Sequence, residues 1–516
     1  MKKLPIGIQD FRELIDGGYV YVDKTEYLYR LISEGKVYFL SRPRRFGKSL
    51  LVSTLEQIFR GNRGLFEGLY IHDKIEWRKH PVIKLDMTQL AYESPEGLKQ
   101  ALMDHVRSVG EAYGLEISGR SPKDIFAALI KELSRTGKVA LLIDEYDKPI
   151  IGALTKTEEC AAYREILKDF YGVIKGLDAY LKFVFLTGVS KFSRTSIFSD
   201  LNNLRDITMA EDYNEICGYR EEDLERYFDG YFERFAEKHG VGKEAILERF
   251  RTWYNGYSWN GGERLYNPFS TLNALADRQF RNYWFETGTP TFLINLMREK
   301  RYDLTRLEDL LLIESGFSKF EIEDIAVEAL LFQTGYLTIQ EVVDKGAERY
   351  YRLGYPNYEV ERSLLDHLLV GYTETPGIRD GRLLLQLREA LESGNLEAFF
   401  AGVESFFAGI PYAIFIAQEW YFASIVYAVL AILGLEGRFE MLTNRGRLDC
   451  AVELGERVYI FGFKLNQAPE KALEQIKQRG YAEKYRASGK RITLVGVAFD
   501  AEKRNVGGWK VEEERA

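Results

Sequence analysis

Short apolar runs alternate with helical patterns over the first 210 residues of the chain. The apolar runs are rich in β-branched and aromatic residues, and we expect them to form buried strands at residues 37–40, 81–86, 138–143 and 183–186. Between them, apolar positions recur with helical spacing from Ser49 onward, over 96–134, where Ser121 and Pro122 open a second helix, and over 157–178. Strands that alternate with helices predict a parallel α/β sheet.

The pattern changes near residue 211. Charged amphipathic helices dominate to about residue 330 and are interrupted by the aromatic loop WYNGYSW at 253–259. A strand-like patch follows at 331–353, and residues 357–400 return to a helical pattern. We therefore expect a helical lid subdomain with a small β patch at 211–350 and a helical connector at 351–404.

The last part of the chain mixes helix and strand patterns. The expected elements are helices at 418–433 and 469–488 and strands at 447–453, 457–463 and 491–498. This order predicts a second α/β domain at 405–516, separate from the α/β domain at 1–210.

Composition narrows the class of protein. A hydrophobic content of 46% is enough to bury large cores, and the net charge of −8 excludes a globally basic protein that coats nucleic acid, although not a local basic site. Cys160, Cys217 and Cys450 form no CxxC pair, which argues against a disulfide framework or a zinc ribbon and fits a cytoplasmic protein. The first residues lack the apolar core of a secretory signal, and no apolar run reaches the roughly 18 residues of a membrane span, so we expect no membrane partner.

The first candidate site is the sequence RPRRFGKS at residues 42–49. A phosphate-binding loop needs backbone amides around the phosphates, a lysine that reaches them and a hydroxyl for Mg²⁺. Gly47, Lys48 and Ser49 supply these groups between an expected strand and an expected helix, whereas Arg42 stands where the usual pattern has its first glycine. We predict that this loop binds ATP and Mg²⁺; the alternative is a basic helix start with a glycine turn.

Two carboxylates, Asp144 and Glu145, follow the apolar run at 138–143. A carboxylate at the C-terminal end of a parallel strand faces the crevice where ligands bind in such sheets. Asp144 can hold Mg²⁺, and Glu145 can act as the general base on the attacking water. The alternative is a solvated acidic turn.

The next expected strand ends at Thr187, a polar residue that can sense the γ-phosphate. Arg194 and Arg205 follow, and they either stabilise transition-state charge, in cis or from a neighbouring subunit, or are surface charges. The candidate catalytic residues are thus Lys48, Glu145 and Arg194. The candidate nucleotide-binding residues are Arg44, Arg45, Phe46, Gly47, Lys48, Ser49, Leu50, Asp144 and Thr187, with Ser49 and Asp144 on the metal.

These motifs resemble the prokaryotic AAA-ATPase-like family, in which a PD-(D/E)xK nuclease-like domain commonly follows the ATPase half. The resemblance covers almost the whole chain and rests on the segments PIGIQDFRELIDGGYVYVDKT, RPRRFGKSL, LLIDEYDKPI, TGVSKFS, SDLNNLRDIT, WYNGYSW, LYNPFS and NYWFETGTPTFL. It implies an α/β fold: a P-loop NTPase with an AAA/ASCE-type parallel sheet, helical lid and connector, followed by an α/β restriction-endonuclease-like domain. It also implies that Arg42 is no defect in the loop, and that Ile8, Phe11 and residues 21–25 pack near the adenine.

In PD-(D/E)xK nucleases an aspartate starts one strand, and an acid-x-lysine pair follows on the neighbouring strand near the metal. The resemblance implies that Asp449 and Lys464 match these positions, with Asp449 as metal ligand, Glu419 on the preceding helix and Gln475 on the following one. Alternation along the strand places residue 462 on the face of Lys464, but the chain has Gly462 where the family has an acid. A single core carboxylate gives too few oxygen ligands for Mg²⁺.

The sequence thus predicts an ATP-binding and ATP-hydrolysing protein that couples its nucleotide state to a catalytically impaired nuclease-like domain. One alternative is an ATP-controlled switch for a protein partner with no role for a nucleic acid. Lys464 can also be an ordinary strand lysine that extends its ammonium group to solvent. The expected partners are DNA or RNA at the C-terminal domain and a second copy of the chain. The other alternative is an active Mg²⁺-dependent nuclease that takes its missing ligand from Glu419, Glu470 or Glu474.

Two further groups of residues allow more than one interpretation. The aromatic segments at 253–259 and 282–288 can stack on bases, although such clusters more often pack between helices. The arginines of RPRRF can contact phosphates, a neighbouring subunit or a nucleic acid.

Overall fold

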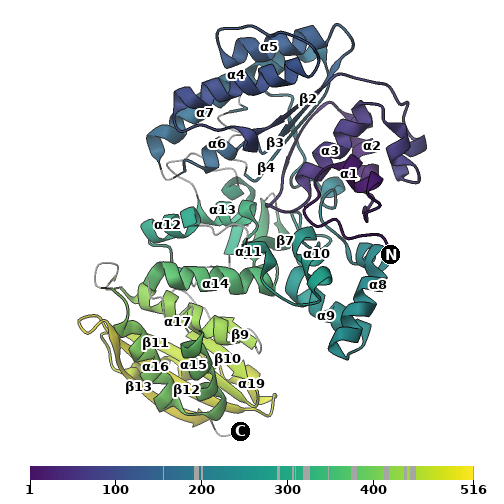
Figure 1. Ribbon diagram of the computed structural model, residues 1–516. Helices are drawn as coiled ribbons and strands as arrows, with labels where there is room; N and C mark the ends of the chain where they lie inside the picture. Colours follow the sequence, from purple (N-terminus) through teal and green to yellow (C-terminus); the bar gives the residue numbers. More distant parts are fainter. Residues whose placement is uncertain are drawn as a thin grey trace. The chain divides into compact units, whose positions relative to one another are not determined.

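The chain folds into two compact units, Met1–Thr287 with Leu311–Glu359 and Gly288–Leu310 with Val360–Ala516 (Figure 1). The first unit contains a five-stranded sheet and a three-stranded sheet, and the second contains another five-stranded sheet. The structure is a computed structural model that describes residues 1–154, 156–190, 197–198, 201–286, 291–304, 307, 310–317, 326–346, 348–373, 381–411, 416, 418–434, 438–441 and 449–514.

The first unit is built on parallel strands in the order β2-β3-β4-β1-β5. The strands are β1 (Val37–Ser41), β2 (Val82–Asp86), β3 (Val139–Asp144), β4 (Leu181–Gly188) and β5 (Arg205–Asp206). β1 and β3 are buried along their whole length, as apolar strands in the middle of a parallel sheet are. The α/β fold predicted for this part of the chain is confirmed.

Helices cover both faces of this sheet. α4, α5 and α7 lie on one side and α3 lies on the other (Figure 1). The predicted start of α5 is confirmed: Ser121 accepts a hydrogen bond from the backbone N–H of Asp124, and Pro122 stands in the first turn. The bounds are α1 (Phe11–Asp16), α2 (Thr25–Glu34), α3 (Lys48–Phe59), α4 (Pro95–Glu111), α5 (Pro122–Leu133), α6 (Lys148–Ile151) and α7 (Thr157–Gly176).

Further helices and a small sheet in the order β6-β8-β7 complete the first unit. They are α8 (Glu221–His239), α9 (Lys243–Tyr254), α10 (Pro268–Asp277), α11 (Tyr283–Glu286), α13 (Val327–Thr334), β6 (Leu310–Ile313), β7 (Thr338–Lys345) and β8 (Glu348–Gly354). The strand-like patch predicted from residue 331 is wrong at its start, because residues 331–334 close α13. Six of the eight residues of this helix are buried. Its apolar residues therefore show neither the helical nor the strand periodicity, and the sequence pattern does not distinguish the two.

The second unit is built on a mixed sheet in the order β13-β12-β11-β10-β9, in which only β11 and β12 are parallel among the described strands. The C-terminal α/β fold is confirmed. The strands are β9 (Arg438–Met441), β10 (Asp449–Leu454), β11 (Arg457–Leu465), β12 (Arg491–Asp500) and β13 (Asn505–Glu514). The helices are α12 (Thr291–Glu299), α14 (Tyr358–Thr373), α15 (Arg382–Ser393), α16 (Leu396–Ala408), α17 (Glu419–Gly434), α18 (Pro469–Gln478) and α19 (Glu483–Arg486).

The two faces of this mixed sheet are covered differently. α18 packs on one face against Ile460, and aromatic rings cover the other, where Phe422 stacks on Phe499 with 4.8 Å between ring centroids. The single helix predicted at 469–488 is wrong, since Gly480, with a φ of 63°, separates α18 from α19. No helix in the described part of the chain is both long and apolar enough to cross a bilayer.

A buried ion pair anchors the N-terminal segment to α8. Lys24 Nζ lies 2.8 Å from Asp223 Oδ2, and both side chains are almost completely buried. Burial opposes the charge of Asp223, but the Lys24 ammonium and hydrogen bonds from Lys24 and Arg220 outweigh this effect and lower the pKa of Asp223. The pair therefore links stability to pH.

Replacing Lys24 with Met is expected to destabilise the first unit by about 3 kcal/mol near neutral pH, because the buried Asp223 carboxylate loses its closer cation and keeps only Arg220, at 3.3 Å. With a lowered pKa, wild-type Asp223 stabilises the fold above its unfolded-state pKa, and this contribution is lost as the pH falls through the folded-state pKa. The difference in melting temperature between Lys24→Met and wild type should shrink from about pH 7 to about pH 3. A difference that is the same at both pH values would contradict this role, and Lys156→Met, at the surface, is the control.

Candidate functional site

Arg42, the first residue after β1, is fully buried. Its guanidinium lies 4.0 Å from the centroid of the Trp259 ring, and burial lowers the pKa of Arg42 to about 10. A structural role for Arg42 is therefore favoured over a phosphate contact, because both terminal nitrogens of its guanidinium already donate inside the fold. They bind the backbone oxygens of Ser41 (2.9 Å), Thr208 (2.8 Å), Tyr213 (2.9 Å) and Asn214 (3.3 Å).

The next residues of the loop divide into exposed cations and a buried ring. The side chains of Arg44 and Arg45 are exposed, and Arg45 lies over the Phe269 ring at 4.8 Å. Phe46 is fully buried, edge-on to Tyr257 and Trp259 at 4.9 and 5.0 Å between centroids. For these two rings of the 253–259 segment, burial under the loop favours packing over stacking on bases.

Gly47 and Lys48 join the loop to α3. Gly47 has a φ of 92°, in the left-handed region that favours glycine, and it stands at the N-cap of α3. Lys48 Nζ donates to the backbone oxygens of Arg42 (3.0 Å) and Pro43 (2.9 Å) across the loop. Ser49 and Leu50, in the first helical turn, are half-buried.

Asp144 brings the strand end and the loop together. It is the last residue of β3 and is buried, and it accepts a hydrogen bond from Ser49. Burial raises the pKa of Asp144, whereas the Ser49 hydrogen bond and the Lys48 charge limit the rise. The structure thus places Lys48, Ser49 and Asp144 at one edge of the sheet.

Glu145, next to Asp144, is half-buried and has a φ of 47°. A left-handed conformation is uncommon for a non-glycine residue, so the surrounding structure must hold this turn. The backbone N–H of Glu145 donates to Asp144 Oδ1 at 3.0 Å.

Thr187, near the end of β4, is completely buried, and its hydroxyl has no hydrogen-bond partner among the residues that the structure describes. β4 lies between β1 and β3 in the sheet, so Thr187 stands between the loop and the acidic turn. Its backbone oxygen accepts from the N–H of Tyr146 at 3.1 Å. A buried hydroxyl without a partner at this place can form a hydrogen bond to a ligand or to a water molecule.

The structure describes only one of the two arginines predicted to stabilise the transition state. Arg194 lies outside the described residues. Arg205, on β5, pairs in register with Tyr38 near the start of β1, and its guanidinium lies 3.7 Å from Glu34. Because β1 runs from Val37 toward the loop, Arg205 stands away from the edge that carries Lys48 and Asp144.

Several residues predicted to lie near an adenine make packing contacts or hydrogen bonds within the first unit, and their role near an adenine stays a prediction. Phe11 is fully buried and packs on Phe66 and Tyr21, with centroids 4.7 and 5.0 Å away. Asp23 accepts from the backbone and hydroxyl of Thr25, which starts α2. Ile8 is half-buried.

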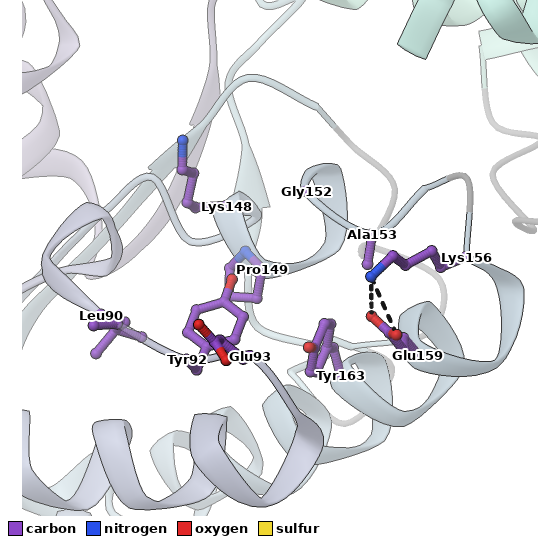
Figure 2. Close-up of a pocket in the computed structure, with 11 residues that line it drawn as sticks. Leu90, Tyr92, Glu93, Lys148, Pro149, Gly152, Ala153, Lys156, Glu159 and Tyr163 are labelled. Carbon is purple, nitrogen blue, oxygen red and sulfur yellow. Dashed lines mark hydrogen bonds and ion pairs between the residues drawn. The ribbon is translucent and has the colours of Figure 1, made fainter.

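An open pocket of about 670 Å³ lies beside the end of β3. Figure 2 shows α6 forming one wall, with Lys148 and Pro149, while Tyr92 and Tyr163 line the floor. The two tyrosine rings meet edge-to-face at 5.4 Å, and Lys156 pairs with Glu159 at the rim. None of the phosphate-loop residues lines this pocket.

In the second unit, Lys464 and Gln475 are brought together as the nuclease pattern predicts. Lys464 is buried on β11 and donates to Gln475 Oε1 on α18 at 2.5 Å. Residue 462 is two positions earlier on the same face, and it pairs in register with Asp449 at the start of β10. Glu419 is the first residue of α17. The side chains of Asp449 and Glu419 lie outside what the structure describes.

The acids considered as replacements for the missing ligand on α18 point elsewhere. Glu470 is exposed and pairs with Lys510 on β13 at 3.0 Å, and this hydrogen bond lowers the pKa of Glu470. β13 and β10 are separated by two strands, so Glu470 leans away from residue 449. Glu474 is also exposed.

Sequence reasoning missed two residues that shape the first site. Arg42 stands where the usual phosphate-loop pattern has a glycine, and this departure is visible in the sequence. Apart from Ser41, its hydrogen-bond acceptors are far away in the chain, so a single sequence does not identify them. Asp147 is buried and holds the turn after β4, whereas in the sequence DEYDK it looks like one more acid of a polar turn.

Both parts of the chain match families of known proteins. Residues 5–198 match the family described as Predicted AAA-ATPase, and residues 417–509 match the PD-(D/E)XK nuclease superfamily. The chain is 43% identical over 524 residues to an uncharacterized protein in the vnfD 5' region of Azotobacter chroococcum mcd 1, and the alignment covers 99% of each chain. The resemblance is thereby confirmed, and the chain belongs to the family of AAA-ATPase-like proteins that carry a C-terminal domain of the PD-(D/E)XK nuclease superfamily.

Proposed function

We propose that the first unit binds ATP with Mg²⁺ and hydrolyses it. The observation that carries this proposal is the meeting of groups from two separate segments, since the Lys48 ammonium and the Ser49 hydroxyl lie beside the Asp144 carboxylate. A phosphate-bound Mg²⁺ takes such hydroxyl and carboxylate oxygens as ligands. The match to the AAA-ATPase family supports the same assignment.

The residues around the loop fit a nucleoside triphosphate. The helix N-terminus at Lys48 offers unpaired backbone N–H groups and the positive end of the helix dipole to phosphate oxygens. Ser49 and Asp144 supply hard oxygen ligands for Mg²⁺. The buried Thr187 hydroxyl, which has no partner in the described part of the chain, suits a γ-phosphate oxygen or its water.

Each residue has one task in the proposed reaction. Lys48 exchanges its two loop carbonyls for phosphate oxygens, and Ser49 and Asp144 hold Mg²⁺, which neutralises phosphate charge when bound. Glu145 accepts a proton from the attacking water. A stabilising role for Arg194 stays a prediction.

MgATP should raise the melting temperature of the wild type but not of Lys48→Ala. A ligand at about 100 times its Kd stabilises the folded state by about 2.7 kcal/mol, and Lys48→Ala loses the cation that binds the phosphates. Thermal shift measurements with and without EDTA test this, and chelation should reduce the wild-type shift. Lys131→Ala, at an exposed position on α5, is the control and should keep the full shift. An equal shift in Lys48→Ala would contradict the site.

For the C-terminal domain we propose an impaired nuclease whose state follows the nucleotide. Turnover in residues 1–210 moves the lid at 211–350, and the connector at 351–404 passes the change to 405–516. Gly462 opposite Asp449 supports impairment, because the acid expected beside Lys464 is missing. Among the side chains that the structure describes, no three His, Cys, Asp or Glu residues form a metal site. The described side chains of the C-terminal domain therefore supply no metal site by themselves, and we assign no metal-dependent step to this domain.

Wild-type protein should cleave DNA or RNA weakly or not at all with Mg²⁺ or Mn²⁺, and Gly462→Glu should increase cleavage by about tenfold or more. The substitution adds a carboxylate on the face of Lys464, where the metal ligand of this superfamily belongs. Labelled duplex and single-stranded substrates with both metals measure the effect. The double variant Gly462→Glu/Asp449→Ala is the control and should lose the gain. Strong wild-type cleavage that survives Asp449→Ala would refute this assignment.

A further inference from the structure

Two turns at the edge of the parallel sheet are tied together by one buried carboxylate. Asp147, in the turn after β3, is almost completely buried and is not among the residues proposed to bind the nucleotide or Mg²⁺. Among the donors that the structure describes, its carboxylate accepts hydrogen bonds only from the turn after β4. These donors are Val189 N (3.1 Å), Ser190 N (2.7 Å) and Ser190 Oγ (2.6 Å).

Tyr146, the neighbour of Asp147, reinforces the same connection. Its hydroxyl donates to the Ser190 backbone oxygen at 2.8 Å, and its backbone N–H donates to the Thr187 oxygen at 3.1 Å. The contact is close: a Cβ at Gly188 would lie 2.5 Å from Asp147 Oδ1 and 2.6 Å from the Tyr146 ring. Neither turn can shift without moving the other.

Glu145 lies in the same turn after β3 and has a left-handed backbone conformation. A φ of 47° at a glutamate persists only where the surrounding structure over-determines it. On its C-terminal side, the Glu145 carbonyl accepts from the Lys148 N–H at 2.9 Å, and Asp147 caps α6 with its backbone oxygen. The Asp147 side chain, together with Tyr146, thus joins this turn to the body of the sheet.

We propose that Asp147 is a positioning residue for Glu145: its bonds to Val189 and Ser190 hold the acidic turn so that the Glu145 carboxylate meets the attacking water. The inference rests on the proposed ATPase function. A buried carboxylate with three short bonds to one turn fixes position better than a neutral side chain, because charge-assisted hydrogen bonds are the stronger ones. Small misplacements of a catalytic group are costly in rate, by about 100-fold for an error near 1 Å.

The test measures kcat and KM for ATP in Asp147→Asn and Ser190→Ala. The asparagine keeps the shape and one acceptor oxygen for the three bonds that converge on Oδ2, but it loses the charge, and its NH₂ group faces the Val189 N–H, which lies 3.3 Å from Oδ1 in the wild type. We expect kcat to fall by about 10- to 100-fold in Asp147→Asn, with KM within about threefold of wild type, and to fall less in Ser190→Ala, which removes only the hydroxyl bond. Rates are referred to the fraction of molecules that bind nucleotide, so loss of folded protein does not count.

A double-mutant cycle separates positioning from general destabilisation. If Asp147 acts through Glu145, Asp147→Asn/Glu145→Gln should keep kcat within about twofold of Glu145→Gln alone. Asp223→Asn is the matched control: it also alters a buried aspartate of this unit, and it should lower the melting temperature while kcat per binding-competent molecule stays unchanged.

Two results would overturn the inference in distinguishable ways. If Asp147→Asn lowers kcat by the same factor in the Glu145→Gln background as in wild type, Asp147 does not act through Glu145, although the ATPase proposal stands. If Glu145→Gln itself hydrolyses ATP at the wild-type rate, the proposed role of Glu145 fails and that of Asp147 fails with it.

Discussion

Replacing Glu145 with Gln is expected to lower kcat for ATP hydrolysis by about 10²- to 10⁴-fold, the usual contribution of a general base. The glutamine keeps the size of the side chain but cannot accept the proton of the attacking water. ATP binding should persist, because the loop, Ser49 and Asp144 are untouched. Phosphate release at saturating ATP, together with a nucleotide-binding isotherm, measures the two effects separately.

The control for this experiment is Glu132→Gln on α5, a surface glutamate that pairs with Arg135. It should change neither binding nor turnover. Wild-type turnover in Glu145→Gln would show that another group activates water, and loss of binding would show that the substitution disturbs the strained turn rather than the chemistry.

Arg42→Gly is expected to destabilise the protein by about 3–5 kcal/mol, although it restores the glycine of the usual phosphate-loop pattern. The substitution removes the guanidinium donors from the buried carbonyls of Thr208, Tyr213 and Asn214, and it leaves the Trp259 ring without its cation. Differential scanning calorimetry measures the loss as a lower melting temperature. ATP binding should weaken rather than improve.

Two companion variants define the cause of the Arg42 effect. Arg42→Met fills much of the volume but removes the same guanidinium donors from the carbonyls, so it should be nearly as unstable as Arg42→Gly. Arg44→Ala changes an exposed arginine of the same loop and should shift the melting temperature little. A stable Arg42→Gly that binds ATP more tightly would mean that the buried guanidinium has no supporting role.

Much of the first site was predictable, because its parts are local. The strand, loop and helix around Lys48 form one continuous stretch, and β3 shows its polar end at Asp144 directly after an apolar run. The phosphate loop and Asp144 are expected at the same edge of the sheet, because the carboxyl ends of parallel strands meet there. The pairing of β10 with β11, which sets residue 449 opposite Gly462, follows from two short strands joined by a tight turn.

The remaining features depend on contacts that are distant in sequence. Arg42 and its acceptors are up to 172 residues apart, and Asp147 and Ser190 are 43 apart. No local pattern marks such pairs. β13 escaped prediction because it is an edge strand with many exposed polar positions, so it shows no apolar run.

The buried Arg42 also determines when the loop can take its shape as the chain is made. Its nearest non-local acceptor, Thr208, is 166 residues away, which takes about 10–30 s to synthesise. During that time the guanidinium has only the neighbouring Ser41 carbonyl and water to bond, and the Trp259 ring is synthesised later still. A nascent chain that ends after β4 would carry every phosphate-binding motif in the sequence without the groups that hold them in place, so competence for nucleotide arises late in translation.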